Sequence, residues 1–359
     1  MDATRDYAYK LGCGRLLFEY GALRKLGAEI QRIGRKAYVI AGSNAASVAA
    51  DAALQSLTDA GIAYTYEIYI GACSEEKGVA LADVIKNEQI DVLIGIGGGR
   101  IMDLIKIAAD IAEVPAAAVP TISATCAAYT PLSVVYSPDG RCRGTWYFRR
   151  EVALVVCDLD ILCAQPARYL AAGILDAMAK HVEINHHLSN LPENQQDNLT
   201  ARLLANTIYT DLLAVGKEAL VHLQNGVKSK TVERCIFHTI ITTGLVSGIA
   251  RGLYQAALGH AFYEAVRTLY PAESKPYLHG EVVAVGLILQ EKYLLHEQAA
   301  DLLRVFMTEA HMPVTLQGIG ITDEHAAVRL SRQEPVPQFY FDSETDPERV
   351  QRILVSMTR

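Results

Sequence analysis

The chain of 359 residues is long enough for two domains, and its hydrophobic content of 51 % supplies enough apolar side chains for their cores, which excludes wholesale disorder. A net charge of −7 without a long basic run argues against a protein that binds nucleic acid backbones. The sequence has no apolar run of roughly 18 residues and no signal-peptide pattern at its start, so we expect neither membrane binding nor export. Its seven cysteines include no C-x-x-C pair, which fits a reducing compartment. We therefore expect a cytoplasmic protein that binds neither membranes nor nucleic acid.

Short apolar runs alternate with helical patterns in the first part of the chain. The runs typical of buried strands cover residues 37–41, 63–70, 91–96, 115–120 and 152–156, and the helical patterns cover residues 45–60, 75–88 and 101–113. This alternation predicts a doubly wound, Rossmann-like parallel sheet with helices on both faces and ligands at the carboxyl ends of the strands. The turn signal Ser137-Pro138-Asp139-Gly140 predicts a hairpin between residues 133–136 and 144–148.

After about Pro166 the pattern changes to successive helical segments as far as residue 308. We therefore expect a dinucleotide-binding α/β domain over residues 1–165 and an all-helical domain over residues 166–359, with the active site between them. The tail from residue 321, which contains Pro335-Val336-Pro337, is predicted to hold one more helix.

A glycine-rich loop, Gly95-Ile96-Gly97-Gly98-Gly99-Arg100, leaves a predicted strand and opens a helix with Asp103 in its first turn. Glycines allow backbone N–H groups to approach a pyrophosphate, and a helix N-terminus adds partial positive charge. The loop is not the Rossmann fingerprint, because Arg100 stands where the last glycine is needed. A tight turn without a ligand, with Asp103 complementing the helix dipole, is the alternative.

The stretch from Cys73 to Tyr136, which contains this loop, Lys106 and Pro120-Thr121, resembles glycerol dehydrogenase and its relatives in the iron-containing alcohol dehydrogenase superfamily. The resemblance continues through residues 131–140 and 167–183 and through His279-Gly280-Glu281, and covers nearly the whole chain. The chain is most similar to a hydroxycarboxylate dehydrogenase-like branch of this family, whose members keep Thr125-Cys126-Ala127-Ala128 and Lys180. The resemblance implies a dehydroquinate synthase-like helical domain, a homo-oligomer and oxidation of CH–OH groups with NADP or NAD.

The resemblance also implies roles for individual residues. Asp176, His260 and His279 would bind one divalent metal ion, for which we expect zinc, with iron, manganese or nickel as alternatives. The residues that would contact the cofactor are Gly42, Ser43, Gly98, Gly99, Arg100, Asp103, Thr121, Ala124, Thr130, Leu132 and Tyr136.

Three departures from the family pattern point to the substrate. Lys180 stands where four-ligand members have a histidine, Tyr263 stands where relatives often place a second histidine, and Cys126 replaces an aspartate that binds polyol in glycerol dehydrogenase. We expect all three to be catalytic, with Tyr263 as a proton or hydrogen-bond donor. The loss of a negative charge at position 126 and the gain of a positive charge at position 180 favour a 2-oxo acid as substrate. Alternatively, Lys180 pairs with Asp176 or Glu183 without metal, and Cys126 is a small core residue.

The first strand of the nucleotide fold ends in Gly42-Ser43-Asn44, without the acidic residue that binds the ribose in NAD-preferring relatives, so we expect NADPH to be accepted. A glycerol or polyol dehydrogenase is the first alternative function. A sugar-phosphate cyclase and a non-catalytic nucleotide-binding protein are alternatives of other classes. A cyclase needs several basic residues around its substrate, and near the expected ligands the sequence offers only Lys180, Arg251, Arg267 and Lys275.

Overall fold

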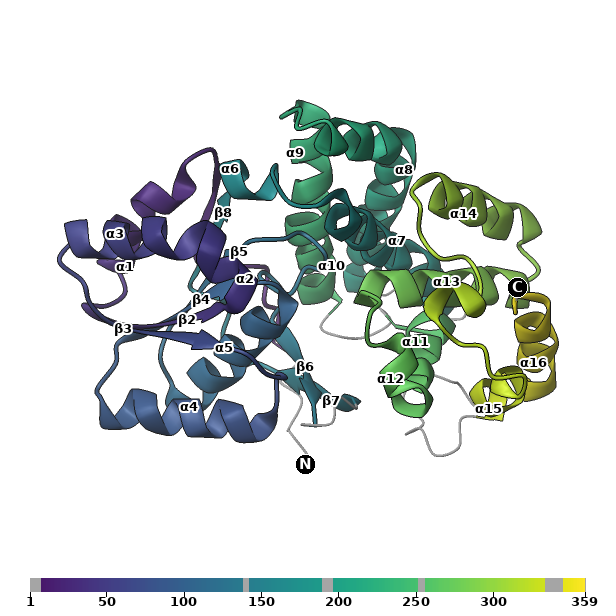
Figure 1. Cartoon of the computed structure of the whole chain (residues 1–359), viewed down its shortest axis with the longest axis horizontal. Coiled ribbons are helices and arrows are strands. Elements are labelled where there is room, and N and C mark those ends of the chain that lie inside the picture. The colour runs from purple at the N-terminus through teal and green to yellow at the C-terminus, as the bar shows by residue number, and fades with distance from the viewer. Residues whose placement is uncertain (1–7, 138–141, 189–195, 251–255, 333–344, 359) are drawn as a thin grey trace.

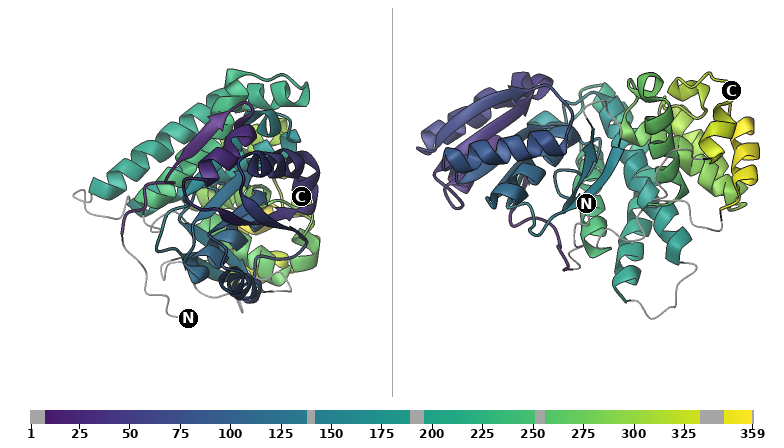
Figure 2. Two further views of the ribbon diagram at one scale, coloured as in Figure 1. Left: turned by 90° about the vertical axis from the view of Figure 1, so that its left-hand side faces the viewer. Right: turned by 90° about the horizontal axis from the view of Figure 1, so that it is seen from below.

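The computed structural model describes residues 8–137, 142–188, 196–250, 256–332 and 345–358. An α/β half and a helical half lie side by side (Figures 1 and 2), with the change near residue 160. The division into two domains at residue 165 stays a prediction.

Six parallel strands form the main sheet, in the order β1-β8-β5-β4-β2-β3. Their bounds are β1 Leu16–Glu19, β2 Lys36–Gly42, β3 Ala63–Tyr69, β4 Val92–Gly97, β5 Ala116–Pro120 and β8 Leu154–Asp158. This sheet confirms the predicted doubly wound α/β fold. Strand β1 was not predicted, because it has four residues and all of them are only half-buried. It pairs with β8 at one edge of the sheet.

Helices cover both faces of the sheet, as Figure 1 shows. Alternate strand residues face opposite sides: Val39 packs with the helices α1 and α3 in one apolar core, whereas Ile40 packs with α4 and α5 in the other. The bounds of these helices are α1 Leu26–Ile30, α3 Asp51–Asp59, α4 Glu75–Asn87 and α5 Gly99–Ala112. A short helix α2, Ser43–Ala45, and a π-helical turn, Ala46–Ala50, lead into α3, so the predicted helix over 45–60 is one continuous helical stretch.

The predicted hairpin is a separate two-stranded antiparallel sheet of β6, Leu132–Tyr136, and β7, Cys142–Tyr147. Val134 pairs with Thr145, and the register shifts at Tyr136. The turn residues 138–141 lie outside the described residues. Strand β7 contacts helix α11 of the other half, so the hairpin joins the two parts of the molecule.

The second half is helical throughout the residues that the structure describes from 159 onward. Its helices are α6 Leu159–Leu162, α7 Ala167–Leu188, α8 Gln196–Gln224, α9 Lys230–Phe237, α10 Thr243–Ile249, α11 Leu258–Leu269, α12 Pro271–Ser274, α13 His279–Tyr293, α14 Glu297–Glu309, α15 Ala326–Arg332 and α16 Pro347–Ser356. The prediction of a single helix in the tail is wrong, because α15 and α16 both form there and pack together. Pro335-Val336-Pro337 lies outside the described residues. None of the described helices combines the length and the apolar character that a bilayer span requires.

Candidate active site

The glycine loop forms the turn between β4 and α5 at the carboxyl edge of the sheet. Gly98 caps α5 with extended backbone, and Gly99 is the first residue of the helix. A Cβ atom on Gly98 would lie 2.8 Å from Ile122 Cδ1, so the turn tolerates no larger residue there without movement of that side chain. A hollow beside the loop is lined by Gly97, Gly98, Gly99, Met102, Pro120, Ile122, Ala124, Thr125, Ala127 and Ala128. The N–H groups and partial positive charge of a helix N-terminus favour an anion such as a phosphate.

Asp103 and Lys106 link α5 to the segment before β6. Their side chains form an ion pair at 3.2 Å, and Lys106 also donates hydrogen bonds to the backbone oxygens of Thr130 and Leu132. Burial raises the pKa of the Asp103 carboxyl, although Lys106 opposes the shift. These contacts hold Thr130 and Leu132, two of the expected cofactor residues, at fixed positions next to the glycine loop.

The other expected cofactor residues lie at the ends of neighbouring strands. Thr121 follows β5, and its N–H donates to the Gly97 oxygen at 3.0 Å. Gly42 ends β2, and Ser43 is exposed at the start of α2. The Arg100 side chain is exposed and donates to the Gly71 oxygen at 3.4 Å. Their roles in cofactor binding stay predictions.

Three helices bring Asp176, His260 and His279 together. Asp176 lies in α7, His260 lies in α11, and His279 is the first residue of α13. His279 Nε2 is 3.3 Å and His260 Nε2 is 3.9 Å from Asp176 Oδ1, and one possible ligand atom of each residue lies within 4.8 Å of those of the others. Ligand atoms about 2.1 Å from a tetrahedral metal ion are about 3.4 Å apart. The side chains therefore fit one divalent ion with little movement.

Close helix contacts make this arrangement possible. A Cβ atom on Gly280 would lie 1.9 Å from the Ala172 oxygen, so only glycine allows the start of α13 to approach α7 beside Asp176. Arg168 of α7 forms an ion pair with Glu281 at 2.6 Å, and Glu281 also accepts the N–H of Leu278 at 2.7 Å. The residues next to His279 thus fix the start of α13, the helix that carries the imidazole.

The electrostatics of Asp176 and His279 favour their metal-binding forms. Burial alone would raise the pKa of Asp176, but His279, Lys180 and His260 hold it below its ordinary value. Burial lowers the pKa of His279, and Asp176 opposes that shift only in part. At neutral pH Asp176 is therefore a carboxylate and His279 a neutral imidazole, which are the forms that bind metal.

A fourth residue, Glu183, contacts this group although sequence reasoning considered it only as a partner for Lys180. Glu183 is fully buried in α7, and its Oε2 lies 2.6 Å from His260 Nδ1. Burial would raise the pKa of Glu183, but His260 and Lys180 hold it low, so the group is ionised. Its position seven residues after Asp176, on the same face of the helix, is the signal that could have identified it.

Lys180 and Cys126 lie beside the metal-binding group, as expected. Lys180, only 7 % exposed, lowers the pKa of both Asp176 and Cys126. Burial and the Asp176 charge nevertheless raise the pKa of Cys126 to about 12, so it is a neutral thiol. The loop that holds Cys126 packs on α7, where a Cβ atom on Gly173 would lie 1.9 Å from the Ser123 oxygen. The buried Lys180 side chain therefore acts on the Asp176 carboxylate, and position 126 supplies no second carboxylate.

Tyr263 connects the metal-binding group to the hairpin. Its hydroxyl lies 3.2 Å from that of Tyr136 at the end of β6, and its ring contacts His279 edge-on with centroids 4.3 Å apart. Arg267 lies over the Tyr263 ring and donates to the backbone oxygens of Ser274 and Tyr277. Two phenols from different halves thus meet beside the His279 imidazole.

The structure describes three of the four basic residues that a phosphate-binding cyclase site would need. Arg267 binds backbone oxygens, Lys275 is exposed, and Arg251 lies outside the described residues. The histidines that match no ligand position have other partners: His181 binds Asn206 at 2.7 Å, and His238 binds Asp211 at 2.8 Å.

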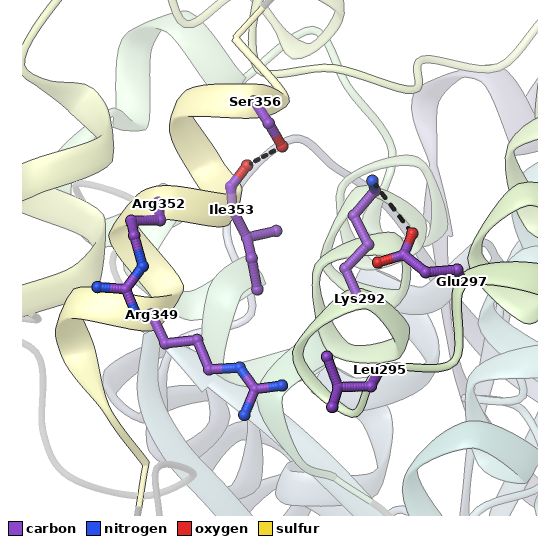
Figure 3. Close-up of a pocket in the computed structure, with 7 residues that line it drawn as sticks. All are labelled: Lys292, Leu295, Glu297, Arg349, Arg352, Ile353 and Ser356. Carbon is purple, nitrogen blue, oxygen red and sulfur yellow. Dashed lines mark hydrogen bonds and ion pairs between the residues drawn. The ribbon is translucent and has the colours of Figure 1, made fainter.

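A second hollow lies between the turn that joins α13 to α14 and helix α16 (Figure 3). Lys292 pairs there with Glu297 at 3.7 Å, and Arg349 lies over the ring of Tyr293. This hollow contains none of the residues expected at the active site.

Comparison with known proteins gives concordant matches. Residues 13–159 match the family model of the iron-containing alcohol dehydrogenases. The chain is 31 % identical over 314 residues to a glycerol dehydrogenase of Thermotoga maritima, covering 86 % of this chain and 84 % of the relative. It is 32 % identical over 252 residues to hydroxycarboxylate dehydrogenase A of Escherichia coli, covering 69 % and 68 %. The crystal structure of a probable glycerol dehydrogenase from Sinorhizobium meliloti superposes with a TM-score of 0.86 at 21 % identity, covering 98 % of this chain and 97 % of the other.

Proposed function

The chain belongs to the glycerol dehydrogenase-like branch of the iron-containing alcohol dehydrogenase family, NAD(P)-dependent enzymes that act on CH–OH groups, and from this premise we propose that it interconverts small 2-hydroxy acids and 2-oxo acids. The observation that carries the proposal is the buried Lys180 next to Asp176, with the neutral thiol of Cys126 close by. The relative named hydroxycarboxylate dehydrogenase A supports the same substrate class.

Each residue of the site has a proposed role. Asp176, His260 and His279 would hold a divalent ion, for which zinc is our proposal, and such an ion supplies Lewis-acid polarisation of a carbonyl. Lys180 would bind the substrate carboxylate through a charge-assisted hydrogen bond. Cys126 would leave that region without the negative charge that repels an acid.

The cofactor would lie on the glycine loop, with its pyrophosphate at the start of α5 and its nicotinamide end near Thr130, Leu132 and Tyr136. Hydride would pass between the cofactor and the carbonyl carbon. Tyr263, held by Tyr136, would exchange a proton with the substrate oxygen.

The test is a screen of carbonyl substrates with NADH and NADPH in parallel, with and without added zinc, manganese and iron. Pyruvate, 2-oxobutanoate and other small 2-oxo acids are compared with dihydroxyacetone and with neutral hydroxyketones of matching size. The proposal requires a higher kcat/KM for the acids. Efficient glycerol oxidation with no reduction of 2-oxo acids would reject it.

A glycerol or polyol dehydrogenase is the second candidate, favoured by the names of the relative from Thermotoga maritima and of the superposed structure. Against it stands Cys126, which supplies no carboxylate to accept hydrogen bonds from polyol hydroxyls. The same screen separates the two functions, because polyols and 2-oxo acids differ in charge.

A further inference from the structure

We infer that Glu183 is a positioning residue of the metal site, which fixes the orientation and tautomer of His260 so that Nε2 is left free to bind the ion. The inference rests on the metal-dependent function proposed above. It concerns a residue that contacts neither substrate nor cofactor and acts through the imidazole.

The carboxylate of Glu183 holds both the ring and the backbone of the start of α11. Oε1 accepts the N–H of Ala257 at 2.8 Å and the N–H of His260 at 2.9 Å, and Oε2 lies 2.6 Å from His260 Nδ1. Because a carboxylate can only accept hydrogen bonds, Nδ1 must carry the proton. With Nδ1 as the donor to Glu183, Nε2 is the ring nitrogen left to bind an ion, and it lies 3.9 Å from Asp176 Oδ1.

The surroundings leave the carboxylate little freedom. Glu183 is fully buried, and a Cβ atom on Gly259 would lie 3.1 Å from its Oε1 and 2.7 Å from Leu287 Cδ2. The N–H of Gly259 is held separately, by Gln290 Oε1 at 3.0 Å. Glu183 is thus packed against the residue that precedes His260, and a rotated carboxylate would lose three hydrogen bonds at once.

Replacement of Glu183 by glutamine tests the tautomer with almost no change in shape. The amide oxygen can keep the two backbone hydrogen bonds, but the amide N–H₂ then faces Nδ1, which must become an acceptor. The favoured tautomer then carries its proton on Nε2, and that proton must leave before Nε2 can bind metal. Loss of a partner that orients a metal-binding histidine typically lowers metal affinity about 10- to 100-fold, and we expect a loss of that size for E183Q.

Cobalt(II) is the probe, because its visible absorption reports both binding and coordination geometry independently of turnover. Wild-type protein, E183Q and Q290M are titrated with cobalt(II) after metal removal by chelation. Q290M is the matched control: it removes the buried hydrogen bonds of Gln290 with the N–H of Gly259 and with the Val182 oxygen without touching the imidazole. We expect Q290M to lose thermal stability but to bind cobalt(II) within about threefold of wild type.

A second measurement needs no variant at Glu183. Long-range ¹H–¹⁵N correlation spectra of metal-free wild-type protein labelled at histidine, assigned with H260Q, report which ring nitrogen of His260 is protonated. Protonation of Nδ1 supports the inference, whereas protonation of Nε2 overturns it even if E183Q does not fold. Equal cobalt(II) affinity in E183Q and wild type, or no binding by wild type, also overturns it. If E183Q binds cobalt(II) about 10- to 100-fold more weakly than wild type, but no 2-oxo acid is reduced, only the proposed function fails.

Discussion

Replacement of Lys180 by methionine removes the buried ammonium on which the proposed specificity depends and keeps a side chain of similar length. The lysine is 7 % exposed, so water cannot readily replace the lost interaction with a substrate carboxylate. A hydrogen bond to a charged group contributes about 1.5–3 kcal/mol, which corresponds to about a 10- to 150-fold change in an equilibrium constant. We therefore expect K180M to raise KM for pyruvate by about that factor.

The substitution also affects Asp176, because Lys180 helps to keep the pKa of that carboxyl low. A loss that acts through Asp176 would affect every substrate. The assay therefore compares kcat/KM for pyruvate and for hydroxyacetone, which has a hydroxymethyl group in place of the carboxylate, and reads the ratio of the two. K180R, which keeps a positive charge, is the control and should retain most of the preference for the acid.

The reasoning fails if K180M lowers kcat/KM for both ketones equally. Lys180 would then act on the metal-binding group or on folding and not on the substrate carboxylate. It also fails if K180R loses the preference for pyruvate completely while its cobalt(II) affinity is unchanged. A positive charge at position 180 would then not be sufficient for that preference.

Three further outcomes are expected. Replacing His279 by alanine should remove activity and one equivalent of bound metal together, measured by elemental analysis; full activity of metal-free wild type would contradict the metal site. We propose that the exposed Ser43 lies beside the cofactor ribose, where a carboxylate would repel a 2′-phosphate. We therefore expect NADPH to be accepted and S43D to lower its kcat/KM at least about tenfold relative to NADH; a hundredfold preference of wild type for NADH would refute this. Burial raises the pKa of Glu291 above its ordinary 4.5, so its ionisation costs stability as pH rises. E291Q should therefore raise Tm at pH 8 and not at pH 4. Equal changes in Tm at the two pH values would contradict a raised pKa of Glu291.

The α/β half could be predicted because its strands are long enough and buried enough to leave a pattern. Strand β4 is wholly buried and ends in the glycine loop, and β2 is buried over five central residues. Strand β1 has four half-buried residues and an apolar run of only three, Leu16-Leu17-Phe18, which is too short to identify a strand, and it is stabilised by pairing with β8. The seven-residue helix α15 is too short to be stable alone and packs on α16, so its existence depends on tertiary contacts.

The metal-binding group could not have been found from spacing in the sequence. Asp176, His260 and His279 come from three helices, and only the resemblance to a family brought them together as an expectation. Their actual proximity depends on backbone contacts such as that of Gly280 with the Ala172 oxygen, which no helical pattern reveals. The relation between Glu183 and His260 was missed for the same reason, although helical spacing already placed Glu183 on the face of Asp176.

The charge of the site argues for an acidic substrate independently of any single contact. Asp176 and Glu183 are ionised and buried, and Lys180 lies close enough to lower the pKa of both. A bound divalent ion and Lys180 would together outweigh the negative charges of Asp176 and Glu183. The site would then keep one net positive charge in a region that water scarcely reaches. Buried net charge is unfavourable, so an incoming carboxylate is stabilised there whereas a neutral polyol is not. With a neutral residue at position 180 the occupied site would be neutral before substrate binds, and this preference for an anion would disappear.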